Sequence, residues 1–168
     1  KSASVAKGTV YLYFKNKEEI IFAIWNMIVE QHMIAFEQRV ASLQGAKEKI
    51  MSFFDFAQCC TIFDTQKILH LYQHFVSAML IDKTGLYTSY FESFFQQDYD
   101  FISARLKEGI ASGEFKEHNV HLLTQSIVLI VKGTLIKAKA NNMAFSDAQA
   151  LLSEEILFLL DNFTRKSS

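Results

Sequence analysis

The stretch of sequence that decides the fold is Val5-Ala6-Lys7-Gly8-Thr9-Val10-Tyr11-Leu12-Tyr13-Phe14-Lys15-Asn16-Lys17. It is rich in lysine and in aromatic residues. Residues 1–17 carry four lysines and no acidic residue, whereas the whole chain has a net charge of −1, so the remainder carries −5. A basic tip on an acidic body is the charge distribution expected when one end of a protein meets phosphate groups.

Composition predicts an all-α fold. The chain has 168 residues, half of them hydrophobic, with no proline and only six glycines. Because sheet-rich folds need frequent turn residues, this composition favours long helices joined by short loops. The uncharged stretches at 20–29 and 119–131 are shorter than the roughly 20 apolar residues that cross a bilayer, so we expect no membrane partner. Adjacent cysteines such as Cys59 and Cys60 rarely form a disulfide, which fits a reducing, cytoplasmic location.

Hydrophobic periodicity and capping signals predict six helices after the basic stretch. Their approximate ranges are 17–43, 46–63, 64–81, 86–112, 119–140 and 146–164. Asn16 with Glu19 is a capping-box variant that begins the first helix, and Ser146 with Gln149 is a capping box for the last. We expect Gly45 to end the first helix in a left-handed turn and Gly113 to end the fourth.

The basic stretch has the features of the second helix of a helix-turn-helix, together with its exit turn. Such a motif needs at least one packed helix ahead of the recognition helix, and only four residues precede Val5. We therefore expect the missing helices to lie upstream of Lys1. On this interpretation residues 1–25 are the C-terminal part of a helix-turn-helix DNA-binding domain. Residues 26–168 form the helical body of the chain.

The residues from Val5 to Ile20 closely resemble the signature of the TetR (tetracycline-repressor-like) family, V-S-K-G-T-L-Y-x-Y-F-x-[SN]-K-E-E-L, without a gap. The resemblance covers residues 3 to about 25. Ala6 replaces the usual serine, which removes a side-chain N-cap worth about 1 kcal/mol, and Ser4 replaces the usual turn glycine. The resemblance implies that residues 26–168 are a helical effector-binding and dimerisation domain. It also implies a homodimeric, ligand-responsive transcription regulator, most often a repressor that an effector releases from its DNA operator.

Chemistry and the resemblance together indicate which residues contact DNA. Lysine side chains neutralise phosphates, hydroxyl groups bond phosphate oxygens or base edges, and a glycine lets the backbone approach the duplex. The candidate DNA-binding residues are Lys7, Gly8, Thr9, Tyr11, Tyr13 and Lys17.

The helical body is unusually aromatic, and the resemblance implies a small-molecule pocket within it. An apolar pocket would suit a hydrophobic or aromatic effector. The candidate lining residues are Phe53, Phe56, Phe63, Tyr72, Phe75, Met79, Phe91, Phe94, Phe95 and Tyr99. Tyr72, Tyr99, His74 and Gln125 are candidate polar contacts. The alternative is that the aromatic residues simply fill a core.

The last two helices are more apolar than the outer layer of a monomer, which suggests burial against a second copy of the chain. The candidate interface residues are Ile127, Ile130, Val131, Leu152, Ile156, Leu159 and Phe163. The alternative is that they complete the core of one chain.

Neither catalysis nor metal binding is indicated by the sequence. No nucleophile–base spacing, phosphate-binding loop or paired-carboxylate pattern is present, so we expect no enzyme and no cofactor. His70 and His74 stand at i and i+4, as in helical metal sites, but no third ligand is evident. The alternative function is a helical dimeric binding protein for an apolar ligand or lipid, with no role on DNA.

Overall fold

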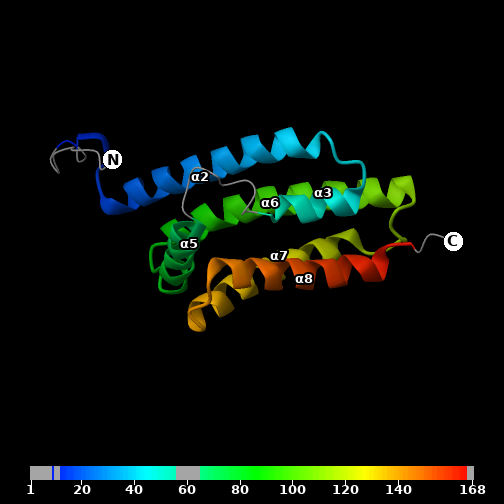
Figure 1. Cartoon of the computed structure of the whole chain (residues 1–168). Helices are drawn as coiled ribbons and strands as arrows, with labels where there is room; N and C mark the ends of the chain where they lie inside the picture. The colour runs from blue at the N-terminus through cyan, green and yellow to red at the C-terminus, as the bar shows by residue number, and fades with distance from the viewer. Residues whose placement is uncertain (1–8, 10–11, 56–64, 166–168) are drawn as a thin grey trace.

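The computed structural model describes residues 9, 12–55 and 65–165, and these ranges form a bundle of α-helices (Figure 1). The predicted all-α fold is confirmed. The helices are α2 (Lys17–Val40), α3 (Ala46–Phe53), α5 (Thr65–Leu80), α6 (Leu86–Ser112), α7 (Val120–Ala140) and α8 (Phe145–Phe163). The C-terminal part of the predicted helix 46–63 lies outside the described residues.

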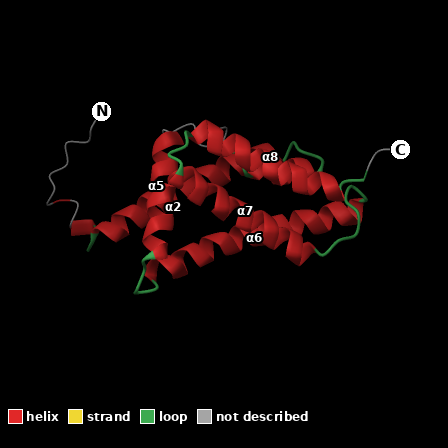
Figure 2. Ribbon diagram, turned by 90° about the horizontal axis from the view of Figure 1, so that it is seen from below, coloured by secondary structure: helices red, strands yellow, loops and turns green. Residues whose placement is uncertain are grey.

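The helices are arranged around the long helix α6. In Figure 1, α2 and α3 lie along one side of α6, and the pair α7 and α8 lies along the other. Figure 2 shows α5 at the end of the bundle nearer the N-terminus. Every helix contributes side chains to a shared hydrophobic core, among them Trp25, Phe53, Phe75, Ile102 and Ile156.

Helix α2 begins at the predicted cap. The Asn16 side-chain oxygen accepts a hydrogen bond from the Glu19 backbone N–H at 2.8 Å, and the Glu19 carboxylate accepts one from the Lys15 N–H at 2.8 Å. This reciprocal bonding satisfies donors that the first turn would otherwise leave free. Farther along α2, the ring of Phe22 stacks on Tyr90 of α6 with 4.4 Å between centroids. The basic stretch therefore leads into a helix that is fixed to the bundle.

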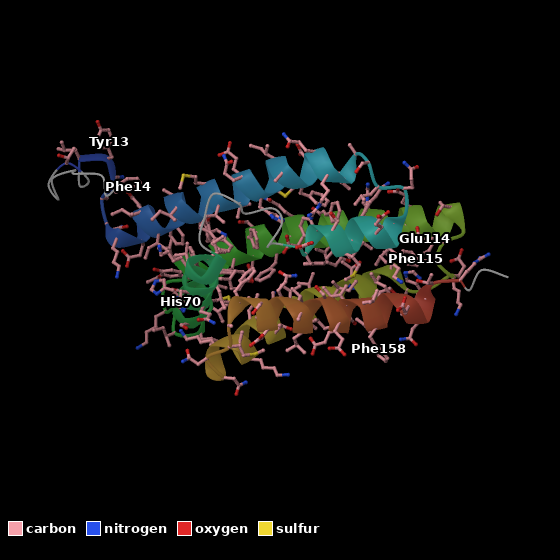
Figure 3. All side chains as sticks on the ribbon, viewed as in Figure 1. Tyr13, Phe14, His70, Glu114, Phe115 and Phe158 are labelled. Carbon is pink, nitrogen blue, oxygen red and sulfur yellow. The ribbon has the colours of Figure 1, made fainter. Side chains whose placement is uncertain are left out.

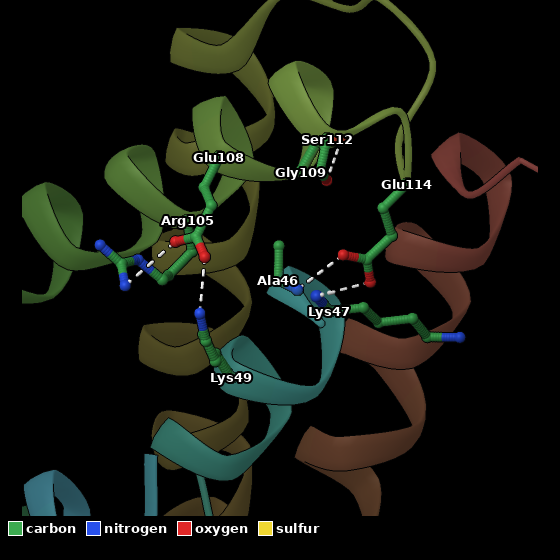
Figure 4. Close-up of polar contacts among 8 residues, drawn as sticks. All are labelled: Ala46, Lys47, Lys49, Arg105, Glu108, Gly109, Ser112 and Glu114. Carbon is green, nitrogen blue, oxygen red and sulfur yellow. Dashed lines mark hydrogen bonds and ion pairs between the residues drawn. The ribbon is translucent and has the colours of Figure 1, made fainter. Parts of the chain in front are cut away.

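The expected left-handed turn at Gly45 is wrong. Helix α2 ends at Val40, and Gly45 has an extended backbone with φ −85° and ψ 144°. The Glu114 carboxylate instead accepts hydrogen bonds from the backbone N–H groups of Ala46 (2.6 Å) and Lys47 (3.0 Å), as Figure 4 shows. A Cβ at Gly45 would lie 3.1 Å from a Glu114 oxygen, so glycine makes room for this carboxylate rather than adopting a positive φ.

Glu114 belongs to a junction that joins the ends of α6 and α8. Gly113 ends α6 with φ 81°, as predicted. The Lys116 N–H then donates to the Phe163 carbonyl at 2.8 Å, and the side chain of Phe115 is fully buried. A Cβ at Gly109 would lie 2.2 Å from Phe115 Cδ2, so glycine at this helical position permits close packing of the ring.

The predicted capping box at the start of α8 is also wrong. Ala144 is the N-cap, without a side-chain hydrogen bond, and Ser146 lies inside the helix. The Gln149 side-chain amide donates instead to the carbonyl of Phe54, at 2.6 Å, and to Ser153 Oγ, at 3.3 Å. The Gln149 side chain therefore makes a tertiary hydrogen bond with the end of α3 instead of the predicted capping-box bond at the start of α8.

Helices α2 and α7 are each long and apolar enough to cross a membrane by length and composition alone, although their uncharged stretches are shorter. Both supply residues of the shared core, including Trp25 and Phe36 on α2 and Leu123 and Ile127 on α7. Apolar side chains of both helices thus pack in the hydrophobic core of the bundle.

Candidate functional site

The predicted DNA-binding residues that the structure describes are exposed at one end of the molecule. Thr9, Tyr13 and Lys17 are all exposed, with 80% of Tyr13 accessible to solvent. Figure 3 shows Tyr13 at the N-terminal end, whereas Glu114 lies near the opposite end of the bundle. Lys7, Gly8 and Tyr11 lie outside the described residues. The described hydroxyl and ammonium groups are therefore available to a phosphate backbone.

A cavity of about 100 Å³ lies inside the helical body, bounded by α2, α3, α5, α6, α7 and α8. Its wall is mostly apolar and aromatic. The lining residues are Trp25, Ile28, Val29, His32, Met33, Phe53, Ile68, Leu69, Tyr72, Phe94, Gln97, Asp98, Phe101, Val131, Thr134, Leu135, Phe145, Ala148, Gln149 and Leu152. Such an apolar space with a few polar groups is typical of a small-molecule site.

Three of the predicted pocket residues, Phe53, Tyr72 and Phe94, line this cavity. The others that are described lie elsewhere. Phe75, Phe91 and Phe95 are buried in the core, and Met79 packs against it. The Tyr99 hydroxyl is hydrogen-bonded to His121 Nδ1 at 2.6 Å. Phe56 and Phe63 are outside the described residues. Of the candidate polar contacts, only Tyr72 is at the cavity.

Trp25, which was not among the predicted pocket residues, is at the centre of the aromatic part of the wall. Its ring makes edge-on contacts with Tyr72, at 5.3 Å between centroids, and with Phe94, at 5.6 Å. On another part of the wall, Phe53 stacks on Phe101 with centroids 4.5 Å apart. The wall thus presents aromatic rings from α2, α3, α5 and α6.

Polar groups in this wall lack the partners that buried polar groups usually have. The indole Nε1 of Trp25 and the hydroxyl of Tyr72 are buried and make no hydrogen bond with any described residue. Asp98 is only 8% exposed, and its carboxyl makes no hydrogen bond with any described residue. Burial raises the pKa of Asp98 from 3.8 to about 7, and the positive charge of Lys132 opposes that rise. The sequence analysis missed Asp98.

The cavity also contains one histidine. His32 is buried, and burial lowers its pKa from 6.5 to about 4, so its imidazole is neutral at neutral pH. Burial also raises the pKa of the Tyr72 hydroxyl, and the nearby Asp98 adds to that effect. Among the described residues, no cluster of three or more His, Cys, Asp or Glu side chains is placed to hold a metal ion.

The structure places most of the predicted interface residues inside one chain. Ile127, Val131, Leu152 and Ile156 are buried in the core, and Ile130, Leu159 and Phe163 are half-buried against it. The buried side chains leave no surface for a partner to cover. The surface of α7 and α8 that remains accessible is carried by other residues.

Exposed apolar side chains occur on both helices of this pair. Leu122, Leu129 and Ile136 recur at seven-residue spacing on α7, and Phe158, which is 70% exposed, points away from the bundle on α8 (Figure 3). Leu157 lies next to Phe158 and is also exposed. We call these five residues the α7–α8 stripe.

Comparison with solved structures shows that two transcription regulators have a similar fold. A TetR transcription regulator from Haloarcula marismortui ATCC 43049 superposes with a TM-score of 0.75 at 12% identity, over 95% of this chain and 81% of that one. A transcriptional regulator from Cytophaga hutchinsonii ATCC 33406 gives 0.67 at 16% identity, over 96% and 83%. At these identities the likeness is one of fold.

The basic end of the chain also matches known proteins in sequence. Residues 1–24 match the family of bacterial regulatory proteins called the tetR family. A fatty acid metabolism regulator protein from Bacillus subtilis (strain 168) is 42% identical over 50 residues. That match covers 30% of this chain and about a quarter (26%) of the relative. Residues 1–24 thus match the tetR family, as the sequence resemblance predicted, and the fold of the chain is similar to those of the two solved regulators.

Proposed function

We propose that this regulator binds operator DNA as a homodimer and is released from it, as a repressor, when an apolar small molecule occupies the cavity. The observation that carries the proposal is the continuity of α2. This one helix starts at the DNA-binding stretch and forms a wall of the cavity through Trp25, Ile28, Val29, His32 and Met33.

The geometry of α2 supports a mechanical link between the DNA-binding stretch and the cavity. A helix rises about 1.5 Å per residue, so Trp25 lies about 12 Å along the axis from Lys17. The boundary that we place near residue 25 falls inside this helix, so the two proposed domains share a rigid element. A ligand that displaces Trp25 therefore also moves the DNA-binding end. Recognition helices of a dimer must enter major grooves about 34 Å apart, so such a movement would weaken DNA binding.

The α7–α8 stripe supports the homodimer. Large apolar residues exposed on two adjacent helices are typical of a surface that another protein covers. Two helices from each copy would form a four-helix interface of the kind seen in bundles. Leu122, Leu129 and Ile136 share one side of α7, because seven residues make about two helical turns. In the proposed dimer the α7–α8 stripe forms the interface, in place of the core residues that the sequence suggested.

Operator binding is tested with the full-length protein and labelled DNA from the region upstream of its own gene, by fluorescence anisotropy. We expect affinity to fall steeply between about 50 mM and about 200 mM salt, because phosphate contacts release counterions. The double variant Tyr13→Ala, Lys17→Ala should bind more weakly with a smaller salt slope. Lys107→Ala, on an exposed site of α6, removes the same charge elsewhere and should bind as the wild type does. Binding that ignores both salt and the double variant would refute the proposal in favour of a binding protein without a role on DNA.

The dimer is tested by sedimentation. Phe158→Asp places a charge in the α7–α8 stripe and should convert dimers to monomers. Ile81→Asp makes a comparable change at an exposed site at the end of α5 and should leave the dimer intact. A Phe158→Asp protein that remains dimeric would show that the interface lies elsewhere.

A further inference from the structure

We propose that the cavity binds a lipophilic organic cation, with the positive nitrogen held by the Asp98 carboxylate against the rings of Trp25 and Tyr72. The inference rests on the proposed function in taking this cavity as the effector site. It goes further by naming the chemical class of the effector.

The first argument is the state of Asp98 in the empty cavity. Its carboxyl is on the cavity wall, is nine-tenths buried, and makes no hydrogen bond with a described residue. Buried carboxyl groups are normally paired or hydrogen-bonded, because a solitary buried charge is very unfavourable. Lys132 does not provide that pairing, since its ammonium group lies over the Phe95 ring, 4.1 Å from the centroid. The Asp98 carboxyl therefore has no donor bonded to it among the described residues.

The second argument is the aromatic surroundings of this carboxyl. Rings of Trp25, Tyr72 and Phe94 contact one another within the same wall. Aromatic faces attract cations, and the attraction is greatest where water is excluded. A carboxylate together with several aromatic rings is suited to an alkylammonium group, whose surface is apolar and whose charge is positive.

The third argument is that the residues lining the cavity offer no positive charge to an anionic ligand. None of the lining residues is a lysine or an arginine, and His32 is neutral. An anionic head group would therefore meet Asp98 and the negative faces of aromatic rings, with no cation on the wall to neutralise it. A fatty acid or another carboxylate is thus disfavoured in this cavity. A cavity of about 100 Å³ accepts a compact group of about the size of benzene or smaller, which suits a trimethylammonium head.

Trp25 provides a direct readout, because it is the single tryptophan of this sequence and is part of the cavity wall. The experiment titrates the full-length protein, without DNA, with tetramethylammonium and follows Trp25 emission. tert-Butanol, which has the same number of non-hydrogen atoms, is the neutral probe, and trimethylacetate is the anionic probe. We expect the cation to bind at least tenfold more tightly than either of the others.

The variant Asp98→Asn tests the role of the carboxyl. Asparagine keeps the size of the side chain but cannot carry a negative charge. We expect the cation to lose at least tenfold in affinity, whereas the neutral probe changes less than twofold. Equal binding of cation and neutral probe by the wild type, or tightest binding of the anion, would overturn the inference. The wild-type comparison alone is decisive if the variant does not fold.

The pH dependence adds a second readout. The titratable or charged groups that face Asp98 from the surrounding helices are His32 of α2, Tyr72 of α5 and Lys132 of α7. Only Asp98 changes charge near neutral pH, because its pKa is about 7. Cation binding should therefore tighten as pH rises from 6 to 8, about in proportion to the ionised fraction of Asp98. A flat profile would contradict binding through this carboxylate.

These measurements separate the ligand class from the proposed function. If tetramethylammonium binds the cavity but no DNA binding is found, the cation site stands and the regulator proposal fails. If the protein binds DNA with the expected salt dependence but prefers the neutral or anionic probe, the regulator proposal stands and the cation site fails.

Discussion

Replacing Asp98 with asparagine should change how stability depends on pH. In the folded chain the pKa of Asp98 is about 7, against 3.8 in the absence of burial. A raised carboxyl pKa means that the folded state keeps a proton that the unfolded state releases. Stability from this group is therefore complete below pH 3.8 and is lost as pH rises to about 7. One pKa unit corresponds to about 1.4 kcal/mol, so the loss amounts to about 4 kcal/mol.

The contribution of His32 to stability changes with pH in the opposite direction, over nearly the same range of pH. Its pKa is lowered from 6.5 to about 4 by burial, so the unfolded state binds a proton that the folded state does not. This contribution destabilises the fold at low pH and disappears as pH rises past 6.5, a change of about 3 kcal/mol. Between about pH 4 and 6.5 the two effects nearly cancel in the wild type.

The assay is urea unfolding of the wild type and Asp98→Asn at several pH values from 4 to 7. Contributions of other groups are common to both proteins and cancel in the difference. We expect the stability of the variant relative to the wild type to increase by about 3 kcal/mol from pH 4 to 6.5. His32→Asn should show the opposite slope. If the difference in unfolding free energy between Asp98→Asn and the wild type does not change with pH, Asp98 has an ordinary pKa. That result would refute the claim that its carboxyl is buried without a partner.

Two further predictions concern the junction at the end of α6. Gly109→Ala should lower the free energy of unfolding by about 2–3 kcal/mol, because its Cβ would overlap the fully buried Phe115 ring; an unchanged urea midpoint would mean that the ring is not packed there. Glu114→Ala should cost about 1–2 kcal/mol, because it removes the acceptor for two N–H groups at the start of α3. Unchanged stability, together with unchanged amide exchange at Ala46, would contradict this capping role.

Much of the fold follows from local sequence signals. The scarcity of turn residues predicts helices, and Asn16 and Gly113 mark helix ends where the structure has them. The predictions failed where a distant residue decided the local structure. The Glu114 carboxylate accepts a hydrogen bond from the start of α3 and sets the conformation around Gly45. The Phe54 carbonyl accepts a hydrogen bond from the Gln149 side chain. Such contacts are between residues far apart in the chain, so no short sequence window contains them.

The site was less predictable than the fold. Aromatic residues were correctly associated with a cavity, but periodicity does not tell which of them face the cavity and which fill the core. A signal for Asp98 was nevertheless present. It occupies a position on the buried stripe of α6 between Phe95 and Ile102, where apolar residues are otherwise found. His32 likewise stands four residues from both Ile28 and Phe36 on α2. A polar residue at an apolar position of a helix is thus the feature to examine first.

The central claim is that the state of the cavity controls DNA binding through α2. The most direct test fills the cavity without a ligand, by the substitution Ala148→Leu in its wall, and measures operator affinity by anisotropy. Ala111→Leu, at an exposed position of α6, is the control for an added side chain. We predict at least fivefold weaker DNA binding for Ala148→Leu, within the usual range of allosteric coupling, and wild-type binding for Ala111→Leu. A folded Ala148→Leu protein that binds DNA as tightly as the wild type would contradict the account.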